Sequence, residues 1–511
     1  MNAKAWTATP FLIGLLLGGA GARYAAADEP PPQPVAEQKG PEMSPEAKIV
    51  GNPDHPDVPA AGTFGPDPSY EGQRYSAEEQ LAIYGSKHMN EPAKPPIMLG
   101  LRLYDRGAYE PRPTWLGAKN PIGFHFMGYG DLRIGGAAYD NGVPAANGKT
   151  EQSTVAARLN LDLDLALTAT ERFHAFVRPL DKGGSFTRYQ ISGGVENEFI
   201  DEFDFDFDTL FFEGDLGAMT QGLTNRPNKI DLPVTIGRVP LLTQNGVWLE
   251  DAFDGAAFAI TAKSSPKLDI SNMDFTFFAG LRQVTTDAAP GTENKVFGMA
   301  GFADAWKGYV EYGYGFISAD NSDLSYHNVT AAFSRRYFGR MANSIRVIGN
   351  FGQKGIAGQP KTADGVLLLL ENSFFKSNPV TLVPYVNLFA GFNNPQSLAR
   401  NADAGGVLRN TGINFESDGL TRYPTLDARA HDSYGGAVGV EYLFDLHRQI
   451  VVEAAVVQRT GDSPLGNEYA LGARYQHPIS NAWIVRLDAM RGWRQGEKDV
   501  YGARVELRRK F

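Results

Sequence analysis

The chain has 511 residues, enough for two or three soluble domains or one large barrel. It contains no cysteine, which excludes disulfides, thiolate metal sites and cysteine nucleophiles. Its formal net charge of −10 argues against a nucleic-acid partner.

Residues 1–27 have the pattern of a secretory signal peptide. Lys4 supplies a positive charge, FLIGLLLGGAGA at 11–22 is a short apolar core, and small residues precede a predicted cleavage after Ala27. An uncleaved N-terminal anchor is the alternative, although the apolar run is short and glycine-rich for a spanning helix.

Residues 28–121 are rich in proline, glycine and charge, and open with DEPPPQPVAEQKGPEMSPEAK. Such a segment buries too little apolar area to fold alone. It is predicted to be a largely disordered tail, with one short helix at 76–88 that Ser76 and Glu79 would cap.

Residues 122–511 alternate apolar and polar positions with period two, which predicts strands. The segment ARLNLDLDLAL at 157–167 places five leucines on one face and Asn160, Asp162 and Asp164 on the other. Soluble sandwiches and membrane barrels both have this pattern. The segments are roughly 10–15 residues long, against the ~5–6 of globular strands and the ~9–11 that cross a membrane. The prediction is an all-β fold, a transmembrane antiparallel barrel of about 18 strands.

The connections alternate in length, as in such barrels. Short turns are predicted at 168–171, 264–267, 304–306, 376–379, 445–448 and 478–481, and longer loops at 139–152, 183–202, 240–252, 285–292, 354–363 and 392–430. The connection 216–231 is long where a short turn is due. It is either a flap at that end or a sign that the strand count is wrong there.

A run of alternating Phe and Asp occupies positions 203–208. In an extended strand Phe203, Phe205 and Phe207 share one face, and Asp204, Asp206 and Asp208 share the other. Charges ~7 Å apart repel by ~0.6 kcal/mol in water but by up to ~12 kcal/mol in a dry interior. A calcium site is the alternative, but a straight strand cannot bring three carboxylates within ~2.6 Å of one ion. We therefore expect the Phe row to face lipid and the Asp row to face a water-filled lumen.

The chain ends in YGARVELRRKF, which carries a strand pattern and a terminal Phe511. This ending resembles the C-terminal insertion signal of Gram-negative outer-membrane barrels. The resemblance implies a porin-like channel in outer-membrane lipid, inserted by the barrel-assembly machinery. Arg509 falls on the expected lipid face, where its long side chain can reach the headgroups.

Basic side chains gather on the first three and last three predicted strands, which adjoin when a barrel closes. We expect one basic wall beside the Asp row, and a transverse field that selects hydrophilic or anionic solutes. Internal salt bridging with little selectivity is the alternative. The predicted pore-lining residues are Arg133, Arg158, Arg172, His174, Arg178, Asp204, Asp206, Asp208, Arg474, Arg486, Arg504 and Arg508.

A constriction requires a segment folded into the lumen. Residues 243–255 are the first candidate, with Trp248, Glu250, Asp251 and Asp254 as its constricting side chains. Residues 195–202 and 392–430 compete for this role, and each of the three is equally readable as a surface loop.

The segment GRVPLLTQNGVWLEDAFDGAAFAI at 237–260 is similar in outline to the alginate-export family of outer-membrane barrels. Gly237, Arg238, Asp254 and Gly255 carry the similarity. The family implies passage of an anionic polysaccharide through a basic pore. In that case the tail at 28–121 is either a docking arm for a periplasmic partner or a segment that reaches the cell wall.

No serine-hydrolase, zinc-protease, P-loop or dinucleotide-binding motif occurs, and the eight histidines lack metal-ligand spacing. We expect no enzyme, cofactor or metal site. The leading hypothesis is passive or selective diffusion of ions and small hydrophilic, preferentially anionic, solutes. The alternatives are export of an anionic polysaccharide and a structural barrel.

Overall fold

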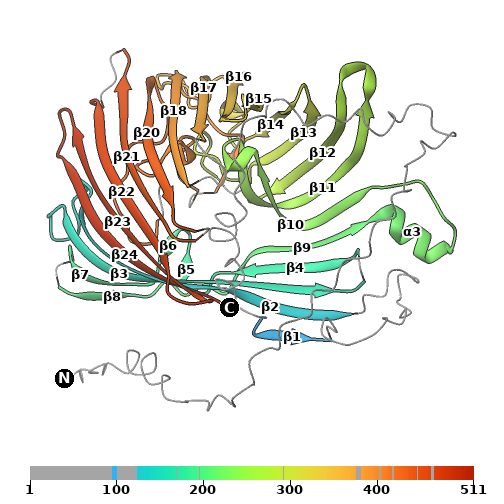
Figure 1. Ribbon diagram of the computed structural model, residues 1–511, viewed down its shortest axis with the longest axis horizontal. Helices are drawn as coiled ribbons and strands as arrows, with labels where there is room; N and C mark the ends of the chain where they lie inside the picture. Colours follow the sequence, from blue (N-terminus) through green and yellow to red (C-terminus); the bar gives the residue numbers. More distant parts are fainter. Residues whose placement is uncertain are drawn as a thin grey trace, which may run out of the picture. The chain divides into compact units, whose positions relative to one another are not determined.

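Figure 1 shows the computed structural model, which describes residues 95–100 and 124–511 except 169, 195, 292, 376–380, 402–403, 417–418, 446 and 462–464. The chain divides into two compact units, 1–66 and 67–511, and all described residues belong to the second. The expected signal peptide and the expected helix at 76–88 lie outside the described residues. Within the described part of the chain, no helix has both the length and the apolar character needed to span a bilayer.

The second unit contains a closed antiparallel β-barrel of 18 strands. Neighbours in the chain are neighbours in the ring, and β24 pairs with β2 to close it (Figure 1). The barrel strands are β2 (His125–Asp140), β3 (Glu151–Ala166), β4 (Arg172–Val177), β9 (Phe207–Asp215), β10 (Pro233–Thr243), β11 (Leu249–Ser265), β12 (Ile270–Arg282), β13 (Lys295–Ala305), β14 (Gly308–Ser318), β15 (Tyr326–Tyr337), β16 (Met341–Phe351), β17 (Val366–Phe374), β18 (Leu382–Phe392), β20 (Ser433–Leu443), β21 (Gln449–Arg459), β22 (Glu468–Pro478), β23 (Trp483–Arg494) and β24 (Val500–Lys510).

Shorter elements decorate the ring. They are β1 (Ile97–Leu99), β5 (Asp181–Lys182), β6 (Ser185–Phe186), β7 (Arg188–Ser192), β8 (Glu198–Ile200), β19 (Ala399–Arg400), the helix α3 (Leu216–Thr224) and the 3-10 turns at Gln244–Gly246, Pro266–Leu268, Ser322–Leu324 and Arg409–Thr411. Strands β7 and β8 continue the sheet beyond β3 where the shorter β4 has ended.

The even strand number places the start of β2 and the end of β24 at one end of the barrel, here called the terminus end; the other is the loop end. Short turns join the strands at the terminus end, and longer segments join most of them at the loop end. The long connection 216–231 is α3 and the residues after it, so the predicted strand count stands. Asp215 caps this helix by accepting from Ala218 N, and its other oxygen accepts from Leu232 N at 2.8 Å.

The period-two pattern produces two faces on every long strand. On β24, Val505 is 49% exposed and points outward, whereas Arg504 is buried and contacts the ring of Tyr423 inside the barrel. Large apolar side chains are exposed along the outside of the other strands in the same way, among them Leu210, Ile236, Phe258, Val347, Leu368, Val438 and Leu471.

The predicted strand over 203–208 is wrong in part. Strand β9 begins at Phe207, and residues 201–206 form a loop. The cause is local, because the Asp204 side chain accepts a hydrogen bond from Asp206 N at 2.9 Å, which competes with strand pairing. Phe203 and Phe205 are exposed as expected, but they do not belong to the strand wall.

The closing seam is completed at the terminus end by residues before and after the barrel. Phe511 exchanges two backbone hydrogen bonds with Gly130, at 2.9 and 3.0 Å. Beyond that point, β1 pairs with the first residues of β2, Leu99 lying opposite Phe126. Strand β1 thus occupies the edge of β2 that β24 leaves unpaired.

Candidate functional site

The barrel interior is crossed by the long segment 393–432, which joins β18 to β20. Its residues contact strands far apart in the ring, which is possible only inside it. Leu398 N donates to Trp248 O at 2.8 Å beside β11, and the Tyr423 hydroxyl lies 3.4 Å from Gly502 O on β24. Buried apolar side chains of this segment, Leu398, Leu408, Phe415 and Leu426, belong to one core with the inner wall.

The segment 243–249 folds inward as well and meets 393–432. Trp248 is fully buried, and its indole nitrogen donates to Asn328 at 2.7 Å. Glu250 forms ion pairs with Arg400 at 3.6 Å and with Arg409 at 3.1 Å. Burial lowers the pKa of Arg400 to about 10 against the opposing effect of Glu250. Two of the three segments that competed as constrictions in the sequence, 243–255 and 392–430, therefore form one plug-like layer. In the third, residues 198–200 form β8 and pair with β7.

Of the other two predicted constriction residues, Asp251 is buried and accepts a hydrogen bond from Thr285 N at 2.7 Å. This bond links the start of β11 to the loop that follows β12. Asp254 follows Phe253, which belongs to the buried core, and lies directly opposite Arg238 of β10. Its place in the constriction stays a prediction.

Glu453 on β21 anchors the middle of the inward segment. Its carboxylate is buried and accepts four hydrogen bonds, from Ile413 N (2.8 Å), Asn414 N (2.9 Å), Asn414 Nδ2 (2.8 Å) and the Tyr385 hydroxyl (2.6 Å). Such convergence of donors on one ionised group is strong and directional. It fixes the chain just before Glu416.

Glu416 reaches from the inward segment to an arginine cluster on the wall. Arg474 and Arg486 both bind Asp488 through their Nε atoms, at 2.7 and 3.0 Å, and both bind Glu416 through their terminal nitrogens. Arg504 contacts Asp488 from the other side at 2.7 Å. Burial alone would raise the pKa of Glu416, but the charges of Arg474 and Arg486 outweigh it and lower the pKa to about 2.

A second arginine group crosses the closing seam. Arg508 of β24, Arg133 of β2 and Arg158 of β3 are direct cross-strand neighbours. Like charges in this position repel. Asp131 offsets the repulsion by pairing with Arg133 at 2.8 Å and Arg508 at 3.0 Å, and Asn160 accepts from Arg158 at 2.9 Å. Three arginines and one carboxylate, Asp131, thus lie together on the strands that close the barrel.

The remaining predicted pore residues lie next to this row. His174 is 2.8 Å from Asp164 and 3.5 Å from Asp162, and Arg172 pairs with Asp164 at 3.5 Å and with Glu213.

Arg178 binds Asp208 at 2.7 Å and Asp181 at 2.8 Å. The expected opposition between a basic wall and an Asp row at 204–208 does not occur. Asp208 is an ion-pair partner of the basic side, whereas Asp204 and Asp206 lie in the loop before β9.

The wall half-way round the ring carries a cluster that sequence reasoning missed. Arg346 on β16 is buried between Glu371 of β17 at 3.1 Å and Glu311 of β14 at 3.9 Å. Strand β14 is the ninth of the 18 and β24 the last, so the two are half a ring apart. In this cluster two carboxylates lie beside one arginine. Each of the three residues stands alone in its strand, so only the register reveals the cluster.

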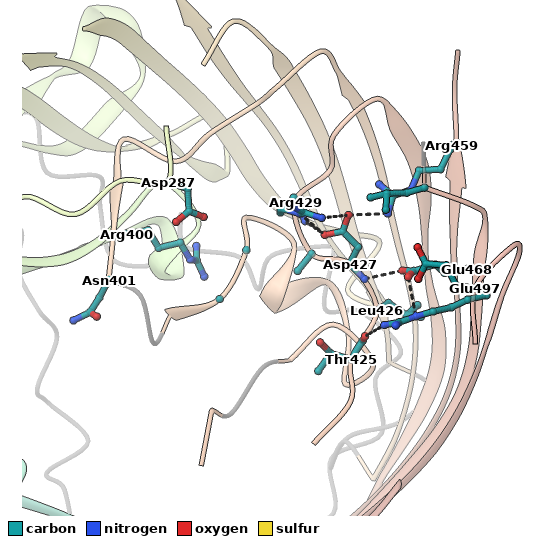
Figure 2. Close-up of a pocket in the computed structure, with 15 residues that line it drawn as sticks. Asp287, Arg400, Asn401, Thr425, Leu426, Asp427, Arg429, Arg459, Glu468 and Glu497 are labelled. Carbon is teal, nitrogen blue, oxygen red and sulfur yellow. Dashed lines mark hydrogen bonds and ion pairs between the residues drawn. The ribbon is translucent and has the colours of Figure 1, made fainter. Parts of the chain in front are cut away.

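A cavity of about 460 Å³ opens at the loop end between 393–432 and the tops of β21 to β23. Figure 2 shows its ion pairs: Asp427 lies between Arg429 and Arg459, at 2.9 and 2.7 Å, and Glu468 faces Arg494. Burial opposes ionisation of Asp427, but these arginines hold its pKa below the usual range. The cavity is a charged vestibule above the inward segment. Among the described residues, no three His, Asp or Glu side chains are grouped to hold a metal.

These features define the class: a closed antiparallel barrel with an apolar outside and an ion-paired interior partly filled by inward-folded loops. No protein-family model matches the chain, and no curated protein matches it. Solved structures with a similar fold come from Pseudomonas aeruginosa. OpdK, determined with vanillate, has 12% identity and a TM-score of 0.49 over 75% of this chain and 98% of its own. OccK7 (OpdD) has 10% identity and a TM-score of 0.47 over 76% and 98%. At these values the similarities carry no argument about function.

Proposed function

We propose that this protein is a channel of a Gram-negative outer membrane that admits ions and small hydrophilic solutes, with a preference for anionic ones. One observation carries the proposal: Arg508, Arg133 and Arg158 form a continuous row inside a closed barrel whose outside is apolar. A closed ring leaves no backbone edge for lipid, and the exposed apolar side chains suit lipid contact.

The preference for anions follows from the charge distribution. The row at the seam places three arginines beside Asp131, whereas the Arg346 cluster half a ring away places two carboxylates beside one arginine. The field between such walls draws anions towards the arginines and orients dipolar solutes.

The partners of this channel are outer-membrane lipid, the barrel-assembly machinery during insertion and the solutes themselves. At the terminus end, Arg509 lies over the ring of Trp483 at 5.4 Å, an arrangement suited to the headgroup boundary. A periplasmic partner of the N-terminal tail at 28–121 belongs to the same proposal.

Export of an anionic polysaccharide is the second candidate function. Gly237 lies opposite Gly255 and Arg238 opposite Asp254, so the four residues behind this idea are structural neighbours. The inward segment 393–432 weighs against it, because a polymer needs an unobstructed lumen.

Planar-bilayer recording of the refolded full chain tests the proposal. We expect steady conductance steps, and under a KCl gradient a reversal potential of the sign that chloride preference produces. If protein that migrates as a folded barrel in unboiled SDS-gel samples gave no conductance steps, the result would contradict the channel.

A further inference from the structure

Helix α3 joins β9 to β10 at the terminus end and has an apolar face that the described residues leave uncovered. Leu216, Met219 and Leu223 share this face, because they stand at positions i, i+3 and i+7 of the helix. None of the three is buried, and Leu216 and Leu223 are 41% and 62% exposed. Figure 1 shows the helix beyond the ends of the two strands that it joins. Leucines therefore stand where a helix surrounded by water carries polar side chains.

The exposed leucines belong to a folded hairpin and not to a loose connection. Asn228, on the return from the helix, donates through Nδ2 to Gly217 O at 2.8 Å and accepts from Ile230 N at 2.9 Å. Gly217 packs so closely on Ile230 O that a side chain at this position would collide with it. The contact fixes the helix against the returning chain.

The polar side chains of α3 also suit surroundings that contain little water. Thr220 donates to Leu216 O and Thr224 donates to Thr220 O, each at 2.7 Å. The nine residues of the helix include no charged side chain, and Gln221 is the only other polar one. The hydroxyl groups therefore need no water, which lowers the cost of moving the helix into a lipid interface.

Cations surround the helix on two neighbouring connections. They are Arg226 and Lys229 on the return from α3, Lys263 near the end of β11 and Lys267 in the turn to β12. Thr261 of β11 donates to Asp231 at 2.9 Å, which ties the two connections together. All four cations are exposed, and within the described part of the chain none forms an ion pair. Two carboxylates, Asp231 and Asp269, lie on the same connections.

We propose that α3 and these four cations form a binding surface for anionic phospholipids of the leaflet at the terminus end. The leucine face lies in the interface, and the cations contact the phosphate groups. An apolar helix face beside Lys and Arg side chains is the pattern of helices that lie in a membrane surface, and each cation adds to the attraction for anionic lipid. This inference rests on the membrane position in the proposed function and adds a lipid ligand outside the solute path.

Native mass spectrometry of the full chain in detergent tests the ligand class, with phosphatidylglycerol and phosphatidylcholine added in equal amounts. We expect bound phosphatidylglycerol to exceed bound phosphatidylcholine by at least about threefold. The variant R226Q/K229Q/K263Q/K267Q should lose this preference, because the groups that contact phosphate are gone.

The matched control is K149Q/K295Q/K354Q/K361Q, which removes four exposed cations at the loop end. It should keep the preference of the native chain. Both variants are compared as protein that migrates as a folded barrel in unboiled SDS-gel samples. No preference in the native chain, or an equal loss in the two variants, would overturn the proposal.

A single fluorescent label tests where the helix lies. The chain contains no cysteine, so L223C can be labelled on the apolar face alone. In nanodiscs of both lipids we expect strong quenching by a phospholipid with a nitroxide near its glycerol, and weak quenching by iodide. Q359C, at an exposed position of a loop-end connection, should show the reverse order. If iodide quenched L223C as strongly as Q359C, the lipid contact would be overturned and the face left to a protein partner.

Planar-bilayer recording of the native chain keeps the two proposals apart. Steady ion current without lipid preference or nitroxide quenching overturns the lipid surface and leaves the channel. Lipid preference and nitroxide quenching without ion current support the surface and contradict the channel.

Discussion

Arg133 and Arg508 lie side by side on the two strands that close the barrel, and Asp131 binds both, at 2.8 and 3.0 Å. The last contact of the ring is thus made between two like charges and one shared carboxylate. These three side chains add an ion-paired contact to the ten residue pairs that join β2 and β24.

Replacing Asp131 by asparagine should weaken the seam and make the lumen more positive. We expect a loss of about 1–2 kcal/mol in the free energy of unfolding, a modest value because Arg508 is partly exposed to solvent. Anion selectivity should rise at the same time. Thermal unfolding in detergent and the reversal potential measure the two effects. Asp499, which pairs with the exposed Arg491, provides the control D499N, which should change neither.

Glu453 should hold the inward segment without being needed for the barrel. E453A removes four hydrogen bonds, so we expect faster proteolysis within 393–432 and larger conductance steps. The variant should still migrate as a folded barrel in unboiled SDS-gel samples. Y385F removes only one of the four bonds and should show a much smaller change. Proteolysis of E453A at the native rate would show that the segment is held by its apolar contacts alone.

On the opposite wall, replacing Arg346 by glutamine leaves Glu311 and Glu371 without their cation. The reversal potential should shift towards potassium preference, because two carboxylates then face the lumen uncompensated. The control is K354Q, in which the cation removed is exposed and lies at the loop end. An unchanged reversal potential in R346Q would mean that this wall does not border the ion path.

The low pKa of Glu416 predicts the pH at which its contact is lost. A carboxyl group whose pKa falls from 4.5 to about 2 on folding contributes its full stabilisation above pH 4.5 and loses it as the pH falls through about 2. Conductance of the native chain should therefore change little between pH 7 and 4 and change below pH 3. The difference between the native chain and E416Q should be largest at neutral pH and fall to about half near pH 2, where half of the Glu416 side chains are protonated.

The strand pattern made much of the fold predictable. The segment ARLNLDLDLAL at 157–167 alternates apolar and polar residues. The polar face that this alternation predicts lies in the interior, where Asp164 pairs with His174. The period-two segments gave the number of strands, and the alternation of short and long connections favoured a membrane barrel over a soluble sandwich.

The site was only partly predictable. The arginines of the first and last strands could be assigned to one wall because closure makes those strands adjacent. Glu416 could not be assigned to that wall, since its partners Arg474 and Arg486 lie 58 and 70 residues away along the chain and are reached by an irregular loop.

The central claim is that the seam arginines govern passage, and the reversal potential of R133Q/R158Q/R508Q under a KCl gradient tests it most directly. The account predicts steady steps whose chloride preference is lost or reversed relative to the native chain. Steps with unchanged chloride preference in a folded variant would contradict it.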